Sequence, residues 1–172
     1  MMKYIIFAMT ACMTLLMPQL ANAQFSSDPG ADTFLYSDDT VSRNGVITLI
    51  GQADIRQGDA RLLADKVEIY TDGSGASGLV TTDGITRVVA TGNFYYITPE
   101  QEVRGDKGIY TADTESFVVT GDVILLQDDS VVTGSQLNYN LQTRDAKVVG
   151  NCNGRKCPKR DRVAILIRST EQ

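Results

Sequence analysis

Four glycines, regularly spaced within alternating apolar residues, constrain what this chain can fold into. Gly92, Gly121 and Gly150 follow one another at intervals of 29 residues, and Gly51 precedes Gly92 by 41. The 12 additional residues of the first interval are accounted for by TDGSGASGLVTTDG at residues 71–84, whose Gly/Ser-rich composition predicts an inserted loop. A period of roughly 20 to 50 residues indicates stacked units, each burying its apolar face only against its neighbours.

Apolar side chains recur at every second position around each glycine. Residues two apart lie on the same face of a β-strand, so this alternation predicts strands with one inward face. A glycine inside such a pattern indicates a bulge or bend where the strand turns a corner. The side chains predicted to share the inward face are Ile47, Leu49, Ile55, Val67, Ile69, Phe94, Tyr96, Phe117, Val119, Val123, Leu125, Leu137 and Tyr139.

The predicted fold class is all-β. No segment beyond residue 23 has the 3.6-residue apolar period of a helix or a helix start signal. Each unit holds about two strands joined by short turns. Residues 38–50 are expected to form a half-unit before the first glycine, and residues 162–168 a final strand. The expected form is an elongated antiparallel β-roll, open at both ends, with sheet edges at residues 36–50 and 163–167.

The N-terminus has the composition of a secretory signal peptide. Lys3 precedes an apolar run, and residues 21–23 form an Ala-x-Ala cleavage sequence. The run is too short and too close to the start to predict a membrane-spanning helix. A lipoprotein anchor at Cys12 is the alternative, but the sequence before it has few apolar residues and lacks the usual Leu. We therefore expect a signal peptide at residues 1–23, cleaved after Ala23.

Composition argues against nucleic-acid binding and against catalysis. The formal net charge is −5, and acidic residues outnumber basic ones before Gly150. Nucleic-acid binding would need basic side chains to neutralise the phosphates. The chain has no His, so a general base would have to come from a carboxylate pair. Asp65 and Asp106 recur within the repeat, so we interpret them as turn or strand-start residues that bind nearby backbone, a metal or catalytic role being the alternative. The sequence predicts no catalytic residue, no metal site and no cofactor.

Cys152 and Cys157 are predicted to form a disulfide. An even pair in an exported chain usually forms a disulfide, and Gly154 between them makes a small closed loop feasible. A zinc site is disfavoured because the mature chain offers only these two ligands of the right kind. A thioredoxin-type redox pair would have two intervening residues rather than four. We interpret the pair as a structural disulfide that closes a short loop.

Three segments resemble the repeat of a known family. GQADIRQGDARLLADKVEIY, GNFYYITPEQEVRGDKGIY and GDVILLQDDSVVTGSQLNY resemble the repeat of the OstA-like family of periplasmic lipopolysaccharide-transport bridge proteins. The family pattern runs G-N-V-x-[IV]-x-Q, a turn, then [IL]-x-[AG]-D-x-[AVL]-x-Y. The resemblance covers roughly residues 37–168. This chain departs from the pattern at Ser135, which replaces the third Asp, at Asp122, which replaces an Asn, and at Gly108, which leaves one inward position empty.

The resemblance implies a fold and a function. The fold would be an OstA-like β-jelly roll open at both ends, with the lipopolysaccharide acyl chains inside it, bound by the inward residues given above. The implied partners are lipopolysaccharide, other copies of this chain stacked head to tail, and the inner-membrane-anchored and outer-membrane transport proteins, joined by β-strand addition. The implied location is the periplasm. A structural β-solenoid without a lipid ligand is the alternative.

The expected domain organisation follows from the signal peptide and from the extent of the resemblance. After the signal peptide we expect a flexible segment at residues 24–36, the β-jelly roll at residues 37–168 and a tail at residues 169–172. The basic C-terminal region is either solvated or in contact with lipid phosphates. Its candidates for phosphate contact are Arg160, Arg162 and Arg168.

Overall fold

The computed structural model describes residues 31–72, 84–143, 145–152, 154 and 156–167. The expected signal peptide, residues 24–30, most of the expected inserted loop, Arg168, the side chain of Arg160 and the expected tail lie outside the described residues. Within the described part of the chain, no helix is long and apolar enough to cross a membrane.

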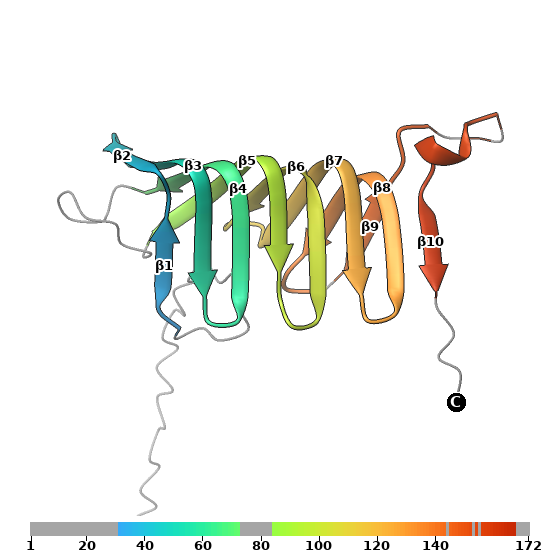
Figure 1. Cartoon of the computed structure of the whole chain (residues 1–172), viewed down its shortest axis with the longest axis horizontal. Coiled ribbons are helices and arrows are strands. Elements are labelled where there is room, and N and C mark those ends of the chain that lie inside the picture. Colours follow the sequence, from blue (N-terminus) through green and yellow to red (C-terminus); the bar gives the residue numbers. More distant parts are fainter. Residues whose placement is uncertain (1–30, 73–83, 144, 153, 155, 168–172) are drawn as a thin grey trace, which may run out of the picture.

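In the described part of the chain, ten strands form one antiparallel sheet, which confirms the all-β prediction (Figure 1). They are β1 (Thr33–Tyr36), β2 (Asp39–Arg43), β3 (Val46–Gln57), β4 (Ala60–Thr71), β5 (Ile85–Ile97), β6 (Gln101–Thr111), β7 (Ser116–Gln127), β8 (Ser130–Asn140), β9 (Ala146–Val149) and β10 (Ala164–Ile167). A 3₁₀ turn, η1 (Lys159–Asp161), precedes β10. Consecutive long strands from β3 to β8 pair as neighbours, so the units stack along the long axis of the molecule.

Each long strand bends near its middle, and the bends fold the sheet into two layers. The pairing register shifts at Ile50/Ala53 in β3 and at equivalent positions in the strands that follow. We call the layer that contains β1 and β10 the front layer, and the layer that contains β2 and β9 the back layer. Figure 1 shows the strands arching over between the layers, with the front hairpins along the lower edge.

Three of the four repeated glycines lie at these bends, whereas Gly150 directly follows β9 and is not part of a strand. Gly51, Gly92 and Gly121 have φ angles of 76°, 79° and 106°, a left-handed region that glycine adopts without steric cost. A Cβ on any of them would collide with the carboxylate of an aspartate from the preceding unit. The aspartates that fill this role are Asp38, Asp65 and Asp106 respectively.

The interpretation of Asp65 and Asp106 as turn or strand-start residues is therefore wrong. Both lie inside long strands, β4 and β6, and each covers the glycine bend of the following unit. Asn93 strengthens one of these contacts, because its side-chain amide donates to both oxygens of Asp65, at 3.1 and 3.0 Å. Glycine and aspartate recur together because each contact joins two successive units.

Two departures from the family pattern have local explanations. The Ser135 hydroxyl donates to the backbone carbonyl of Val149 at 2.9 Å, which an ionised aspartate could not do because it has no donor. Contrary to the expectation, Gly108 does not leave an empty position. The Phe94 ring occupies the space where a Cβ of Gly108 would lie, and Phe94 is 1% exposed.

The two ends of the sheet are formed by interrupted strands (Figure 1). β1 and β2 pair with opposite halves of β3, so the sheet begins at Thr33 rather than at residue 37, and β3 itself is not an edge. β10 and β9 pair with opposite halves of β8. The strand expected at residues 162–168 is therefore present as β10.

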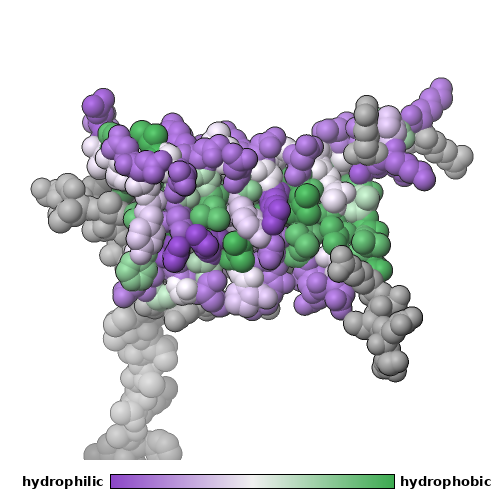
Figure 2. All heavy atoms as spheres, viewed as in Figure 1, coloured by the Kyte–Doolittle hydropathy of each residue, from purple (hydrophilic) through white to green (hydrophobic). Residues whose placement is uncertain are grey.

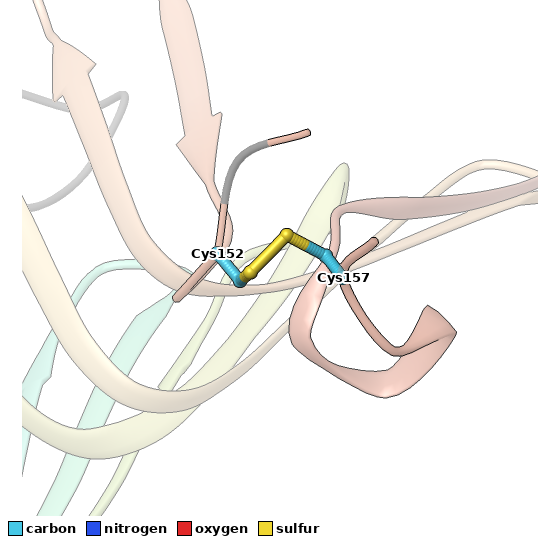
Figure 3. Close-up of a disulfide and its surroundings, with 2 residues drawn as sticks. All are labelled: Cys152 and Cys157. Atoms are coloured by element: carbon cyan, nitrogen blue, oxygen red, sulfur yellow. A yellow bond between two sulfur atoms is a disulfide. The ribbon is translucent and has the colours of Figure 1, made fainter. Parts of the chain in front are cut away.

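A disulfide between Cys152 and Cys157 closes the start of the segment that connects β9 to β10 (Figure 3). The Cys152 amide also donates to the carbonyl of Asp161 at 3.1 Å, which ties the start of this segment to η1. The segment thus takes the place that a glycine bend has in the preceding units.

Candidate functional site

The inward face predicted from the sequence is the interior between the two layers. Eleven of the thirteen predicted side chains belong to the buried core, and Tyr96 and Tyr139 are half-buried and pack against it. Their packing is not uniform along the molecule. Ile47, Val67 and Ile69, near the β1/β2 end, are 5%, 0% and 3% exposed and are enclosed by other side chains.

Toward the β9/β10 end, the interior contains a cavity of about 160 Å³. The side chains that line it are Tyr96, Gln101, Val103, Tyr110, Phe117, Leu125, Gln127, Leu137, Tyr139, Leu141 and Ala146. Five predicted site residues are among them, namely Tyr96, Phe117, Leu125, Leu137 and Tyr139. The other eight predicted residues, Ile47, Leu49, Ile55, Val67, Ile69, Phe94, Val119 and Val123, are part of the packed core.

Strand pairing places the cavity walls opposite one another. In the front layer, Tyr96, Val103 and Leu125 are cross-strand neighbours on β5, β6 and β7. In the back layer, Tyr110, Phe117 and Tyr139 are cross-strand neighbours on β6, β7 and β8. The Phe117 ring centroid lies 5.7 Å from that of Tyr96 and 5.5 Å from that of Phe94, so these three rings pack together beside the cavity.

Sequence reasoning missed the polar part of this wall. Gln101 and Gln127 are directly paired on β6 and β7, next to the front hairpin turns. Each lies two residues from a buried side chain, Val103 and Leu125 respectively, and so continues the inward alternation by one step. The signal was present in the sequence, but the prediction selected only apolar residues.

The described residues that line the cavity include no charged side chain. Burial raises the pKa of Tyr96 to about 12, with further contributions from Tyr139, Asp59 and Glu100. Burial likewise raises the pKa of Tyr110. Both hydroxyls are therefore neutral at physiological pH and can donate and accept hydrogen bonds.

Charges lie on the outer face instead. The Asp54 carboxylate accepts hydrogen bonds from Arg56 and Arg61 at 2.7 and 2.8 Å, and these bonds lower the pKa of Asp54 to about 2. The Arg104 guanidinium lies 4.4 Å from the ring centroid of Tyr95. Figure 2 shows this outer face as largely hydrophilic, with an apolar area over the end that carries β10. A charged exterior around an uncharged interior suits binding of an apolar chain.

Metal ions and phosphate groups are other ligands that polar side chains can bind. Among the described residues, no group of three or more His, Cys, Asp or Glu side chains could hold a metal ion. Of the arginines considered for phosphate contact, Arg162 is exposed and is not part of the cavity wall.

Comparison with known proteins assigns the family. Residues 31–145 match the sequence model of a family described as LptA/(LptD N-terminal domain) LPS transport protein. The chain belongs to this family. Membership confirms the resemblance seen in the repeats. It also supports the expectation that this LPS transport family protein is not an enzyme, since the family is one of transport proteins.

A solved structure has the same fold as this LPS transport family member. It is the crystal structure of LptH, described as the LptA homologous periplasmic component of the conserved lipopolysaccharide transport device from Pseudomonas aeruginosa. The alignment has a TM-score of 0.65 and 18% sequence identity, and covers 84% of this chain and 100% of that chain. It confirms the open antiparallel fold. A search of curated proteins finds no match.

Proposed function

We propose that this protein is a periplasmic carrier that holds the acyl chains of lipopolysaccharide between its two layers. It passes them from the inner toward the outer membrane within an end-to-end assembly of copies. An inner-membrane-anchored transport protein joins one end of this assembly and an outer-membrane transport protein the other, by β-strand addition. The observation that carries the proposal is the uncharged, mainly apolar cavity between the layers of a chain from an LPS transport family.

The energetics of acyl-chain burial favour this use of the interior. Each methylene removed from water contributes about 0.8 kcal/mol, so even a partly enclosed chain gains several kcal/mol. The cavity of about 160 Å³ is smaller than typical ligand sites, which have volumes of roughly 300 to 1,000 Å³. We infer that the layers separate when a chain enters, and that Leu125 and Phe117 then contact it.

The sheet edges support end-to-end assembly. In β10, Ile165 and Ile167 are 64% and 75% exposed, and in β1 Phe34 is 54% exposed. Open edges with exposed apolar side chains favour pairing with another chain, because backbone hydrogen bonds supply affinity there. An edge at each end allows each copy to join two neighbours.

The N-terminal sequence and the disulfide support the proposed location. We propose cleavage of the signal peptide after Ala23, which delivers the mature chain to the periplasm. The Cys152–Cys157 disulfide is compatible with that compartment, because disulfides form and persist in oxidising environments.

Photocrosslinking in cells with labelled lipopolysaccharide tests the proposal. A photoreactive amino acid at Leu125 or Phe117 reports on the cavity, and the same amino acid at Ile124, the adjacent outward position on β7, is the matched control. We expect lipopolysaccharide adducts from the two cavity positions and not from Ile124. Exported, folded protein without adducts at the cavity positions would favour the structural β-solenoid without a lipid ligand.

A further inference from the structure

The cavity wall ends in a pair of amides at the front hairpin turns. Gln101 and Gln127 are cross-strand partners and line the cavity together with Leu125, two residues before Gln127. Gln101 is half-buried and Gln127 is exposed, so the pair lies where the apolar interior meets water. Each amide offers two N–H donors and a carbonyl acceptor without carrying a charge.

Carboxylates lie near Gln101 on the solvent side, and Asp128 directly follows Gln127. A shallow groove on the outer side of the same turns is bordered by Gln101 together with Glu100, Glu102 and Asp128. Glu100 and Asp128 repel an anionic phosphate, whereas Glu102 accepts a hydrogen bond from Tyr95 and lies 4.0 Å from Arg104. Uncharged oxygen atoms are therefore the suitable partners of the amides. We call Gln101 and Gln127 the rim of the cavity. The rim is uncharged toward the cavity, and carboxylates lie beside it on the solvent side.

We propose that Gln101 and Gln127 form a binding site for the uncharged linkage oxygens of an acylated amphiphile, the ester or amide carbonyls and hydroxyls where the acyl chain joins its headgroup. This inference rests on the proposed function, because the acyl chain must fill the cavity before its linkage can reach the rim. The amides then bind the first polar atoms that follow the chain. The site selects carbonyl-linked acyl chains over plain alkyl chains.

A pair of synthetic probes tests this site on the purified mature protein. One probe is glucosamine carrying a single ester-linked acyl chain, and the other is its ether analogue of equal chain length, which lacks the carbonyl. We expect the wild type to bind the ester about tenfold more tightly, as two hydrogen bonds would provide. In the Gln101→Leu/Gln127→Leu variant, the two probes should bind equally, at the affinity that the wild type shows for the ether.

Two further variants control for folding and for shape. Gln101→Glu/Gln127→Glu keeps the size of both side chains but removes their N–H donors, so it should also lose the ester preference. Gln136→Leu removes an amide from the other side of β8, where its partner is Asn138, and should keep the preference. Thermal unfolding of each variant verifies that it is folded.

The outcomes separate this inference from the carrier proposal. Equal binding of ester and ether by the wild type, or an ester preference that survives in both double variants, overturns the rim site and leaves the carrier standing. A wild type that binds neither the probes nor lipopolysaccharide overturns the carrier proposal and, with it, the rim site.

Discussion

At the scale of single residues, the contact between a glycine and an aspartate of the preceding unit explains the repeat. Gly92 needs a left-handed φ to turn the corner, and the carboxylate of Asp65 occupies the space beside it. Residue 92 must therefore be glycine, because a side chain there would be strained and would also collide with the carboxylate.

Replacing Gly92 should therefore destabilise the protein. We expect Gly92→Ala to lower the free energy of unfolding by about 2 kcal/mol or more, as measured by urea denaturation. Part of this cost is collision, so Gly92→Ala should cost less in an Asp65→Ala background. Gly154→Ala is the control, since Gly154 also has a positive φ but an added Cβ there would meet no atom within 4 Å beyond its chain neighbours. If Gly92→Ala lowered stability equally in both backgrounds, collision with Asp65 would not be a reason why residue 92 is glycine.

The ion pairs of Asp54 should make stability depend on pH. The pKa of Asp54 lies at about 2 in the folded chain, below its ordinary value of 3.8, so the ionised pairs stabilise the fold above about pH 4. That stabilisation is lost as the pH falls toward 2. Since Arg56 and Arg61 are 50% and 42% exposed, solvent screening limits it to about 1 kcal/mol.

The measurement compares the wild type with Asp54→Asn by urea denaturation near neutral pH and near pH 2. We expect the wild type to be about 1 kcal/mol more stable at neutral pH and to lose most of that advantage in acid. A difference that does not change with pH would contradict the assigned ion pairs.

At the scale of elements, the two interrupted end strands differ from the continuous strands between them. At the β9/β10 end, residues 150–163 and the Cys152–Cys157 disulfide take the place of a glycine bend. Among the residues that the structure describes, four pairs hold β10 to β8, so the connection from β9 has to position this short edge strand.

Removing the disulfide should loosen β10. We expect Cys152→Ser/Cys157→Ser to lower stability by about 2 kcal/mol and to speed hydrogen exchange of the Ala164–Ile167 amides before that of the central strands. Amides of β6 provide the internal reference. Unchanged exchange in β10 would show that the disulfide does not position this strand.

Lysines on the inward face of β10 should weaken end-to-end assembly. An added strand would place its inward side chains beside Ile165 and Ile167, so charges there would be buried at the junction. We expect Ile165→Lys/Ile167→Lys to weaken self-association at least tenfold, measured by sedimentation. Leu166→Lys, on the outward face, is the control and should have a smaller effect. Equal effects would argue against strand addition at β10.

The sequence predicted the strands and their inward face better than it predicted the site. Alternation around Gly51, Gly92 and Gly121 identifies which side chains point inward, because the two-residue period is a local property of a strand. It does not determine how closely two layers approach. Ile69 and Tyr139 satisfy the same rule, yet Ile69 is enclosed in the core and Tyr139 lines the cavity. The difference comes from side chains of neighbouring units, such as the rings of Tyr96 and Phe117 beside the cavity, and the period of a single strand does not show these contacts.

At the scale of the whole molecule, we propose that the two layers separate to admit an acyl chain. The glycine bends form one side of the interior, and the hairpin turns form the other, where the layers are not joined by continuous strands. Opening at the turns would enlarge the cavity without breaking pairing within either layer. The β9/β10 half should open more than the enclosed β1/β2 half.

The distance between the two ends of β8 measures this opening directly. Spin labels on Asp129→Cys and Gln142→Cys lie in the front and back turns that flank β8, and labels on Arg43→Cys and Asp59→Cys flank β3 as the control. We predict that lipopolysaccharide lengthens the β8 distance, with a smaller change across β3. An unchanged β8 distance in protein that has bound lipopolysaccharide would contradict acyl-chain binding between the layers.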